Sequence, residues 1–151
     1  MLYRKDAETQ SWSYRLCVSA VIFMEKQRYN NLSKEILDAS LFVHKEVGPG
    51  LLESVYELCL AKELDLRGVK SQRQVYLPLL YRGEELNKDF RIDLLVEEEI
   101  IIEIKAVEVL LPVHEAQIIS YLKLAKKKLG FLINFNVPLL KNGFRRFVNN
   151  F

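Results

Sequence analysis

Three charged side chains, Asp93, Glu103 and Lys105, interrupt the largely apolar stretch at residues 90–105. If the three glutamates at 97–99 form a loop, the flanking strands pair Asp93 directly with Glu103. Lys105 then lies two residues further along the same face. Opposed carboxylates destabilise a sheet and a buried unpaired charge is costly, but a divalent cation between the two acids removes both costs. The spacing therefore predicts a metal site with an ammonium group beside it, and such an ion can act as a Lewis acid.

This interpretation depends on the register of the hairpin. A two-residue turn would pair Asp93 with Ile102 and place the two acids on opposite faces, because a slip of one residue turns a whole strand over. Alternatively, the charges simply face water on an edge hairpin. We prefer the three-residue loop because three glutamates belong in solvent. The isoleucine-rich run at 100–104 is also typical of a strand buried on both faces.

Hydrophobic periodicity predicts three helices and four or five strands around this hairpin. The strand at 75–81 is expected near an edge because Pro78 cannot donate to a ladder. Pro112 suits the first position of a helix, and Gly130 is expected to break that helix at its end. The predicted helices span 33–47, 51–67 and 112–128, and the predicted strands span 75–81, 85–96, 100–107, 131–135 and, as a short final addition, 144–148.

This order of elements predicts an α/β fold with one mixed sheet. The first three strands form an antiparallel meander, since only short turns connect them. The third and fourth strands are joined through a helix, so we expect them to be parallel with a right-handed crossover. Helices then flank the sheet.

Further polar residues accompany the acidic strands. Gln117 and Tyr121 share one face of the helix at 112–128, together with His114. Glu53 lies at the positive end of the second helix, where a carboxylate is favoured. Each also has a purely structural interpretation: Glu53 as a first-turn charge, Gln117 as a surface residue and Tyr121 as a core aromatic. We expect a helix-start role for His114. We expect His44 to be structural and Tyr56 to pack its helix onto the sheet.

Composition limits the remaining possibilities. A chain of 151 residues suits one domain with a real core, and the net charge of +2 leaves a polyanion only local basic patches. Such patches occur at 126–128 and 145–146. Cys17 and Cys59 are too few for a disulfide framework or a zinc site, which favours a reducing, cytoplasmic setting. No apolar run is long enough to span a membrane.

Residues 1–30 form an N-terminal extension that differs from the domain expected at 31–151. The apolar segment 16–23 follows basic residues as in a secretory signal, but the polar stretch at 6–13 and the lack of a small-residue cleavage site argue against one. A further interpretation is that Met24 is the true start and that the residues before it are not native.

The motif Gly50-x-x-Glu53-x-x-Tyr56 resembles the signature of the GxxExxY proteins, compact members of the PD-(D/E)XK nuclease superfamily with a restriction-endonuclease-like sheet. The likeness covers residues 33–150. The sequence also resembles the core of lambda-type exonucleases and of the nuclease domains of bacterial recombination helicases. One departure is Ile92, where the superfamily often has proline before the first metal-binding aspartate. The further matching segments are Asp93-Leu94-Leu95-Val96, Glu103-Ile104-Lys105-Ala106, His114-Glu115-Ala116-Gln117-Ile118-Ile119-Ser120-Tyr121-Leu122 and Leu132-Ile133-Asn134-Phe135.

The resemblance implies a metal-dependent nuclease that hydrolyses phosphodiester bonds of DNA or RNA. Mg²⁺ or Mn²⁺ would be held by Asp93, Glu103 and the carbonyl of Ile104, with Glu53 joining directly, through water or at a second ion. Lys105 would orient or deprotonate the attacking water. Gln117 would hydrogen-bond Lys105 or a phosphate, and Tyr121 would do likewise or pack against the nucleotide.

Two other classes of function remain open at this point. The fold could bind nucleic acid or a protein without cutting anything, since a fold does not fix a function. It could also be a structural or toxin–antitoxin-type interaction protein. A homodimer or a protein partner suits so small a domain. Neither DNA versus RNA, exo- versus endonuclease action nor the number of metal ions follows from the sequence.

Overall fold

The computed structural model describes the backbone of residues 3–150, and within it the side chains of residues 11–86 and 89–150. The chain divides into two compact units, Met1–Glu35 and Ile36–Phe151. Helix α1 (Tyr3–Val47) accounts for the described part of the first unit and continues into the second. It ends at Val47 as predicted, but it begins far before the predicted residue 33. None of the described helices has the length and apolar character needed to cross a membrane.

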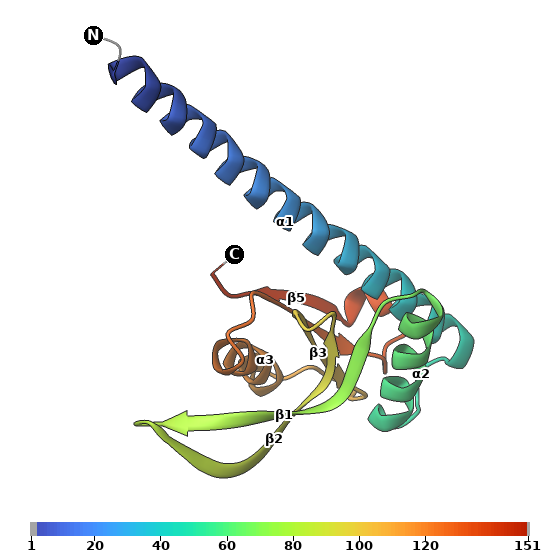
Figure 1. Ribbon diagram of the computed structural model, residues 1–151. Coiled ribbons are helices and arrows are strands. Elements are labelled where there is room, and N and C mark those ends of the chain that lie inside the picture. The colour runs from blue at the N-terminus through green and yellow to red at the C-terminus, as the bar shows by residue number, and fades with distance from the viewer. Residues whose placement is uncertain (1–2, 151) are drawn as a thin grey trace. The chain divides into compact units, whose positions relative to one another are not determined.

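The second unit is built on one five-stranded mixed sheet with strand order β1-β2-β3-β4-β5 (Figure 1). Strands β3 and β4 run parallel and are joined through helix α3 (Pro112–Leu124), whereas every other neighbouring pair is antiparallel. The predicted meander, the parallel crossover and the short final strand are therefore confirmed. The strands are β1 (Ser71–Tyr81), β2 (Glu84–Val96), β3 (Ile100–Lys105), β4 (Leu129–Asn134) and β5 (Phe144–Val148).

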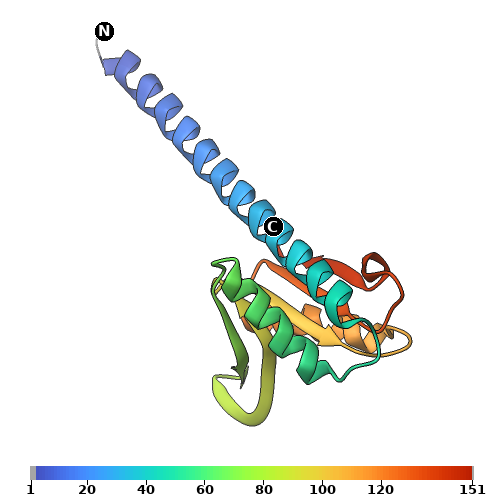
Figure 2. The same cartoon turned by 90° about the vertical axis from the view of Figure 1, so that its right-hand side faces the viewer.

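Helices α2 (Glu53–Leu66) and α3 (Pro112–Leu124) cover opposite faces of the sheet (Figures 1 and 2). Tyr56 of α2 stacks on Phe135, with ring centroids 4.6 Å apart, so it packs its helix onto the sheet as expected. On the other face, α3 buries apolar side chains against strands β2, β3 and β4. The core on that face includes Leu95, Ile101, Ile118, Leu122 and Leu132.

Two local features explain where the predicted boundaries were right and wrong. Strand β1 is an edge strand, as Pro78 indicated, and its register with β2 shifts between Leu77 and Leu79. Helix α3, however, ends at Leu124 rather than at 128, and Lys126 then adopts a left-handed φ of 53°. Gly130 is therefore not a helix break. It lies within β4, where an added Cβ would sit 3.0 Å from Cδ1 of Ile118, so glycine allows α3 to pack closely on the strand.

Candidate active site

The hairpin of β2 and β3 has the register that places the two acids opposite each other. The pairs are Val96 with Ile100, Leu95 with Ile101, and Leu94 with Ile102, so residues 97–99 form the predicted three-residue loop. Glu97 and Glu98 turn the chain with φ values of 49° and 60°. Continued by one rung, this register sets Asp93 against Glu103. The alternative two-residue turn is thereby excluded.

The regular ladder stops at Leu94 and Ile102, and a side chain replaces it. The backbone N–H of Ile104 donates to Oδ2 of Asp93 at 2.8 Å. Because the N–H and C=O of one residue point to the same side of an extended strand, the carbonyl of Ile104 also faces β2. The end of the ladder thus presents one carboxylate and one carbonyl oxygen at the same place.

Glu103 is the most unusual group of the site. Its side chain is only 1 % exposed, and its Oε1 atom is buried without a hydrogen-bond partner among the described residues. Burial, and after it the charge of Asp93, raise the pKa of Glu103 from 4.5 to about 9, while the charge of Lys105 opposes the shift. A buried carboxyl with an unused oxygen is costly unless it is protonated or meets a cation.

Asp93 and Lys105 share this environment. Burial raises the pKa of Asp93, against the hydrogen bond from Ile104 and the charge of Lys105, and the charges of Glu57 and Glu53 add to the increase. Lys105 is half-buried and lies two residues beyond Glu103, on the same face of β3. The charge of Lys105 thus acts on the pKa of both acids, and the charge of Asp93 acts on the pKa of Glu103.

Glu53 reaches this place from the first position of α2. Its Oε1 accepts a hydrogen bond from the N–H of Ala106 at 3.3 Å, directly after β3. The rest of the Gly-x-x-Glu-x-x-Tyr motif holds the loop before the helix. Gly50 has a φ of 97°, which favours glycine. The hydroxyl of Tyr56 donates to the carbonyl of Gly48 at 2.7 Å and accepts from the N–H of Leu51 at 3.0 Å.

Sequence reasoning missed two residues beside this group, Glu57 and Gln74. Glu57 is buried on α2 and Gln74 lies on β1, and together with Glu53 and Asp93 they line a hollow of about 560 Å³. We call this the acidic hollow. The spacing of four residues between Glu53 and Glu57 could have indicated a shared helix face. Nothing local pointed to Gln74, since the predicted strand began one residue after it.

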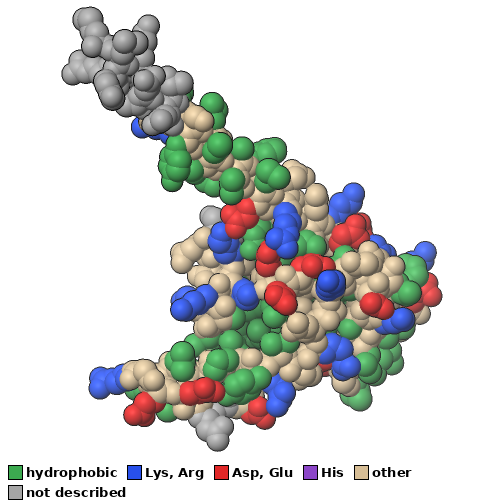
Figure 3. Space-filling view, viewed as in Figure 1, with side chains coloured by type: hydrophobic (Ala, Val, Ile, Leu, Met, Phe, Trp, Pro, Cys, Tyr) green, Lys and Arg blue, Asp and Glu red, His purple; other side chains and the backbone are tan. Residues whose placement is uncertain are grey.

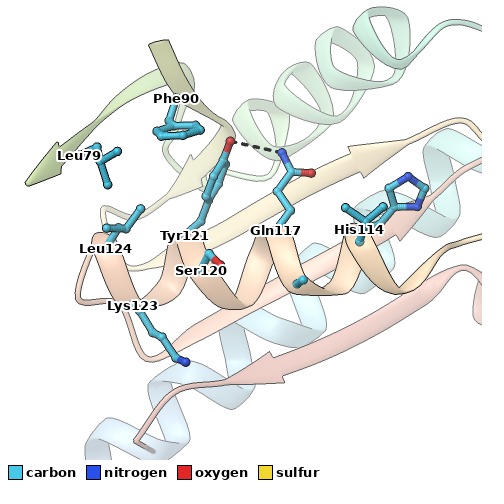
Figure 4. Close-up of a pocket in the computed structure, with 10 residues that line it drawn as sticks. Leu79, Phe90, His114, Gln117, Ser120, Tyr121, Lys123 and Leu124 are labelled. Atoms are coloured by element: carbon cyan, nitrogen blue, oxygen red, sulfur yellow. Dashed lines mark hydrogen bonds between the residues drawn. The ribbon is translucent and has the colours of Figure 1, made fainter. Parts of the chain in front are cut away.

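Gln117 and Tyr121 lie on α3 and are joined to each other, with Nε2 of Gln117 donating to the tyrosine hydroxyl at 3.2 Å (Figure 4). They line a second, largely apolar hollow of about 690 Å³ between α3 and the β1–β2 hairpin. The side chain of Tyr121 is part of the core on the α3 face of the sheet, and its ring packs edge-on against the ring of Phe90. These two side chains therefore border a different hollow from the one lined by Glu53 and Asp93.

The two histidines have the structural roles expected of them. Nδ1 of His114 accepts a hydrogen bond from the N–H of Leu111 at 3.0 Å, which caps the start of α3. Nε2 of His44, near the end of α1, lies 2.7 Å from the carbonyl oxygen of Val137. Neither histidine is among the residues that line the acidic hollow.

The donor set suits a hard divalent cation in part. Among the described residues, no three His, Cys, Asp or Glu side chains stand close enough together to hold a metal ion by themselves. Asp93 and Glu103 would therefore need the carbonyl of Ile104 and water to complete a shell, with Glu53 near its edge. The unpartnered Oε1 of Glu103 is the observation that fits a cation, because it is an acceptor with no donor.

One of the comparisons with known proteins identifies a family for this chain. The search of curated proteins and the search of solved structures gave no match to the chain. The sequence model of the PD-(D/E)XK nuclease superfamily, by contrast, matches residues 30–147, which include all the acids, the lysine and the α3 residues described above. The chain therefore belongs to the PD-(D/E)XK nuclease superfamily.

Proposed function

We propose that this protein is a metal-dependent nuclease that hydrolyses phosphodiester bonds. The observation that carries the proposal is the buried Oε1 of Glu103, which finds no hydrogen-bond partner in the part of the chain that the structure describes; Glu103 lies opposite Asp93, one rung beyond the last regular pair. A buried polar atom of this kind lacks the hydrogen bond that would offset the cost of its burial. Its position is explained if it serves as an acceptor for a cation.

In this proposal Asp93, Glu103 and the carbonyl of Ile104 hold Mg²⁺ or Mn²⁺, and Glu53 supports them directly or through water. The bound ion would act as a Lewis acid that offsets negative charge on the phosphate during attack. Ile104 fixes the orientation of the Asp93 carboxylate through its N–H. Lys105, on the face of Glu103, would orient the attacking water with its ammonium group.

Gln117 and Tyr121 have a supporting role in the same proposal. Their hydrogen bond orients the tyrosine hydroxyl along α3, and they line the hollow beside the hairpin (Figure 4). From this hollow, which is separate from the acidic hollow, they would contact another part of the substrate. Charges of both signs mix on the molecular face drawn in Figure 3, so nucleic acid would be met by local patches rather than by a uniformly basic surface.

Within the superfamily we assign the chain to the GxxExxY branch. The roles of the three motif residues support this assignment. Gly50 provides the left-handed turn, Glu53 reaches the end of β3, and Tyr56 holds the intervening loop. The free thiols of Cys17 and Cys59 suit a reducing compartment, so we place the reaction in the cytoplasm.

The test compares cleavage of single- and double-stranded DNA and RNA in Mg²⁺, in Mn²⁺ and in a chelator. We expect wild-type protein to cut at least one substrate only with metal, and Asp93→Asn and Glu103→Gln to lose both cleavage and Mn²⁺ binding. Lys105→Met should keep Mn²⁺ binding but lose turnover. Matched controls are Glu98→Gln, an exposed acid in the β2–β3 loop, and Lys141→Met, an exposed lysine after β4.

Other results would favour the other classes of function. Wild-type protein that cuts nothing with either ion, but binds nucleic acid equally well in chelator, is a binding module. A stable stoichiometric protein partner that is unaffected by all three site substitutions indicates an interaction protein. Either result would overturn the nuclease proposal.

A further inference from the structure

Two consecutive residues of β1 direct their side chains to the same buried carboxylate. Nε of Arg73 donates to Oε1 of Glu57 at 2.8 Å, and Nε2 of Gln74 donates to Oε2 of Glu57 at 2.7 Å. In a regular strand, neighbouring side chains point to opposite faces. Both oxygens of Glu57 can be engaged in this way only if the strand departs from regular geometry.

The departure occurs at Gln74 itself. Its φ is 52°, in the left-handed region that non-glycine residues rarely occupy inside a strand. The flanking pairs are Arg73 with Leu94 and Val75 with Ile92, and the rung between them, Gln74 with Asp93, is missing from the ladder. Strain of this kind persists only where surrounding contacts impose it, and it is concentrated at functional sites.

The strained residue touches the candidate metal ligand. Besides its bond to Glu57, Nε2 of Gln74 lies 3.5 Å from Oδ1 of Asp93. The other oxygen of that carboxylate, Oδ2, accepts from the N–H of Ile104. Within the described residues, each oxygen of Asp93 thus accepts from one of these two donors, and a carboxylate oxygen with one donor retains a lone pair for a cation.

We propose that Gln74 is a positioning residue for Asp93, anchored by the Glu57–Arg73 ion pair on its other side. The amide bridges two carboxylates that would otherwise repel each other, and so it fixes the direction in which Asp93 offers its free lone pairs. This inference rests on the proposed function, because it takes Asp93 as a metal ligand. Residues that orient a ligand in this way commonly change metal affinity by about 10- to 100-fold.

The test is Gln74→Gly, because glycine accepts a φ of 52° without strain and removes the whole side chain, including the amide. We expect Mn²⁺ affinity, measured by calorimetry, to fall at least about 10-fold. Gln74→Asn also tolerates the left-handed region, but its side chain is one methylene shorter, so it should show the same loss. The matched control is Arg82→Gly, which relieves a φ of 51° at the tip of the hairpin and should leave Mn²⁺ affinity unchanged. Wild-type affinity in Gln74→Gly would overturn the proposal.

A metal-free measurement separates this proposal from the proposed function. In chelator, a double-mutant cycle of Gln74→Gly with Asp93→Ala should show non-additive shifts in the urea unfolding midpoint, because the two residues interact. The cycle of Arg82→Gly with Asp93→Ala should be additive. If wild-type protein binds no Mn²⁺ but the first cycle is non-additive, the metal site is wrong and Gln74 still positions Asp93. If the first cycle is additive, the role of Gln74 is wrong.

Discussion

The backbone N–H of Ile104 donates to Oδ2 of Asp93 at 2.8 Å, at the point where β2 and β3 stop pairing. A side chain therefore takes the place of the next ladder bond. The two strands thus remain connected beyond their last regular pair. This contact gives Asp93 a structural role that is separate from its charge, and the two roles can be tested separately.

Asp93→Asn should keep the structural role and remove the charge. Asparagine still offers an oxygen to Ile104, and the repulsion that Asp93 experiences from Glu53, Glu57 and Glu103 disappears. We expect the metal-free variant to be at least as stable as wild type. Asp93→Ala should instead lose about 1–3 kcal/mol, because the N–H of Ile104 loses its acceptor. Urea unfolding in chelator measures both, and an asparagine variant less stable than the alanine variant would contradict this account.

Glu103 predicts an unusual dependence of stability on pH. Its pKa is about 9 in the folded protein and 4.5 without the influence of the fold. The folded state therefore keeps a proton that the unfolded state loses. The contribution of this proton to the free energy of unfolding is complete below pH 4.5 and decreases as pH rises towards 9. The limiting slope is about 1.4 kcal/mol per pH unit.

The measurement is the urea midpoint of the metal-free protein between pH 5 and pH 8.5, which lies inside the range from pH 4.5 to about 9 over which the slope should act. Glu103→Gln cannot lose a proton, so its stability should decrease much less over this range. The variant should also be more stable than wild type at the alkaline end. Parallel pH profiles for the two proteins would show that Glu103 is ionised in the folded state.

We expect Asn134 to hold the segment that follows β3 in place. This residue is buried at the end of β4, and its Oδ1 accepts from the N–H of Val107 at 3.1 Å, while its Nδ2 donates to the carbonyl of Val107 at 2.8 Å. Asn134→Ala should cost about 2–3 kcal/mol by leaving these backbone groups unpaired. Hydrogen exchange at residues 106–111 should increase as well. The control Asn142→Ala, at an exposed position, should do neither.

The strongest sequence predictions came from local rules. The three glutamates at 97–99 determined the loop and hence the register of β2 with β3, and Pro78 indicated the edge strand. Pro112 marked the start of α3. Each of these rules depends on residues that are close in the chain, because backbone freedom and solvation act on single residues and on neighbours.

Contacts between distant elements could not be read in the same way. The bonds of Glu57 with Arg73 and Gln74 join α2 to β1 and need a left-handed residue inside a strand, which no propensity favours. Gln117 was predicted to share a face of α3 with Tyr121. Its amide was expected to bond to Lys105 or a phosphate, but in the structure it donates to Tyr121. Gly130 was taken for a helix break, because the close approach of Ile118 that requires glycine there is a tertiary contact.

A substitution of Tyr56 tests whether the loop before α2 positions Glu53 in the acidic hollow. Its hydroxyl bonds to Gly48 and Leu51, and its ring stacks on Phe135, so Tyr56→Phe removes the two bonds and keeps the stacking. We expect a loss of about 1–3 kcal/mol in unfolding free energy.

The same substitution should weaken Mn²⁺ binding, because the loop that places Glu53 becomes less ordered. The matched control is Tyr76→Phe, whose hydroxyl bonds to Glu85 on the exposed surface of the hairpin and should change neither quantity measurably. A Tyr56→Phe variant that is less stable but binds Mn²⁺ as tightly as wild type would show that this loop supports the fold alone. Glu53 would then not depend on Tyr56 for its position.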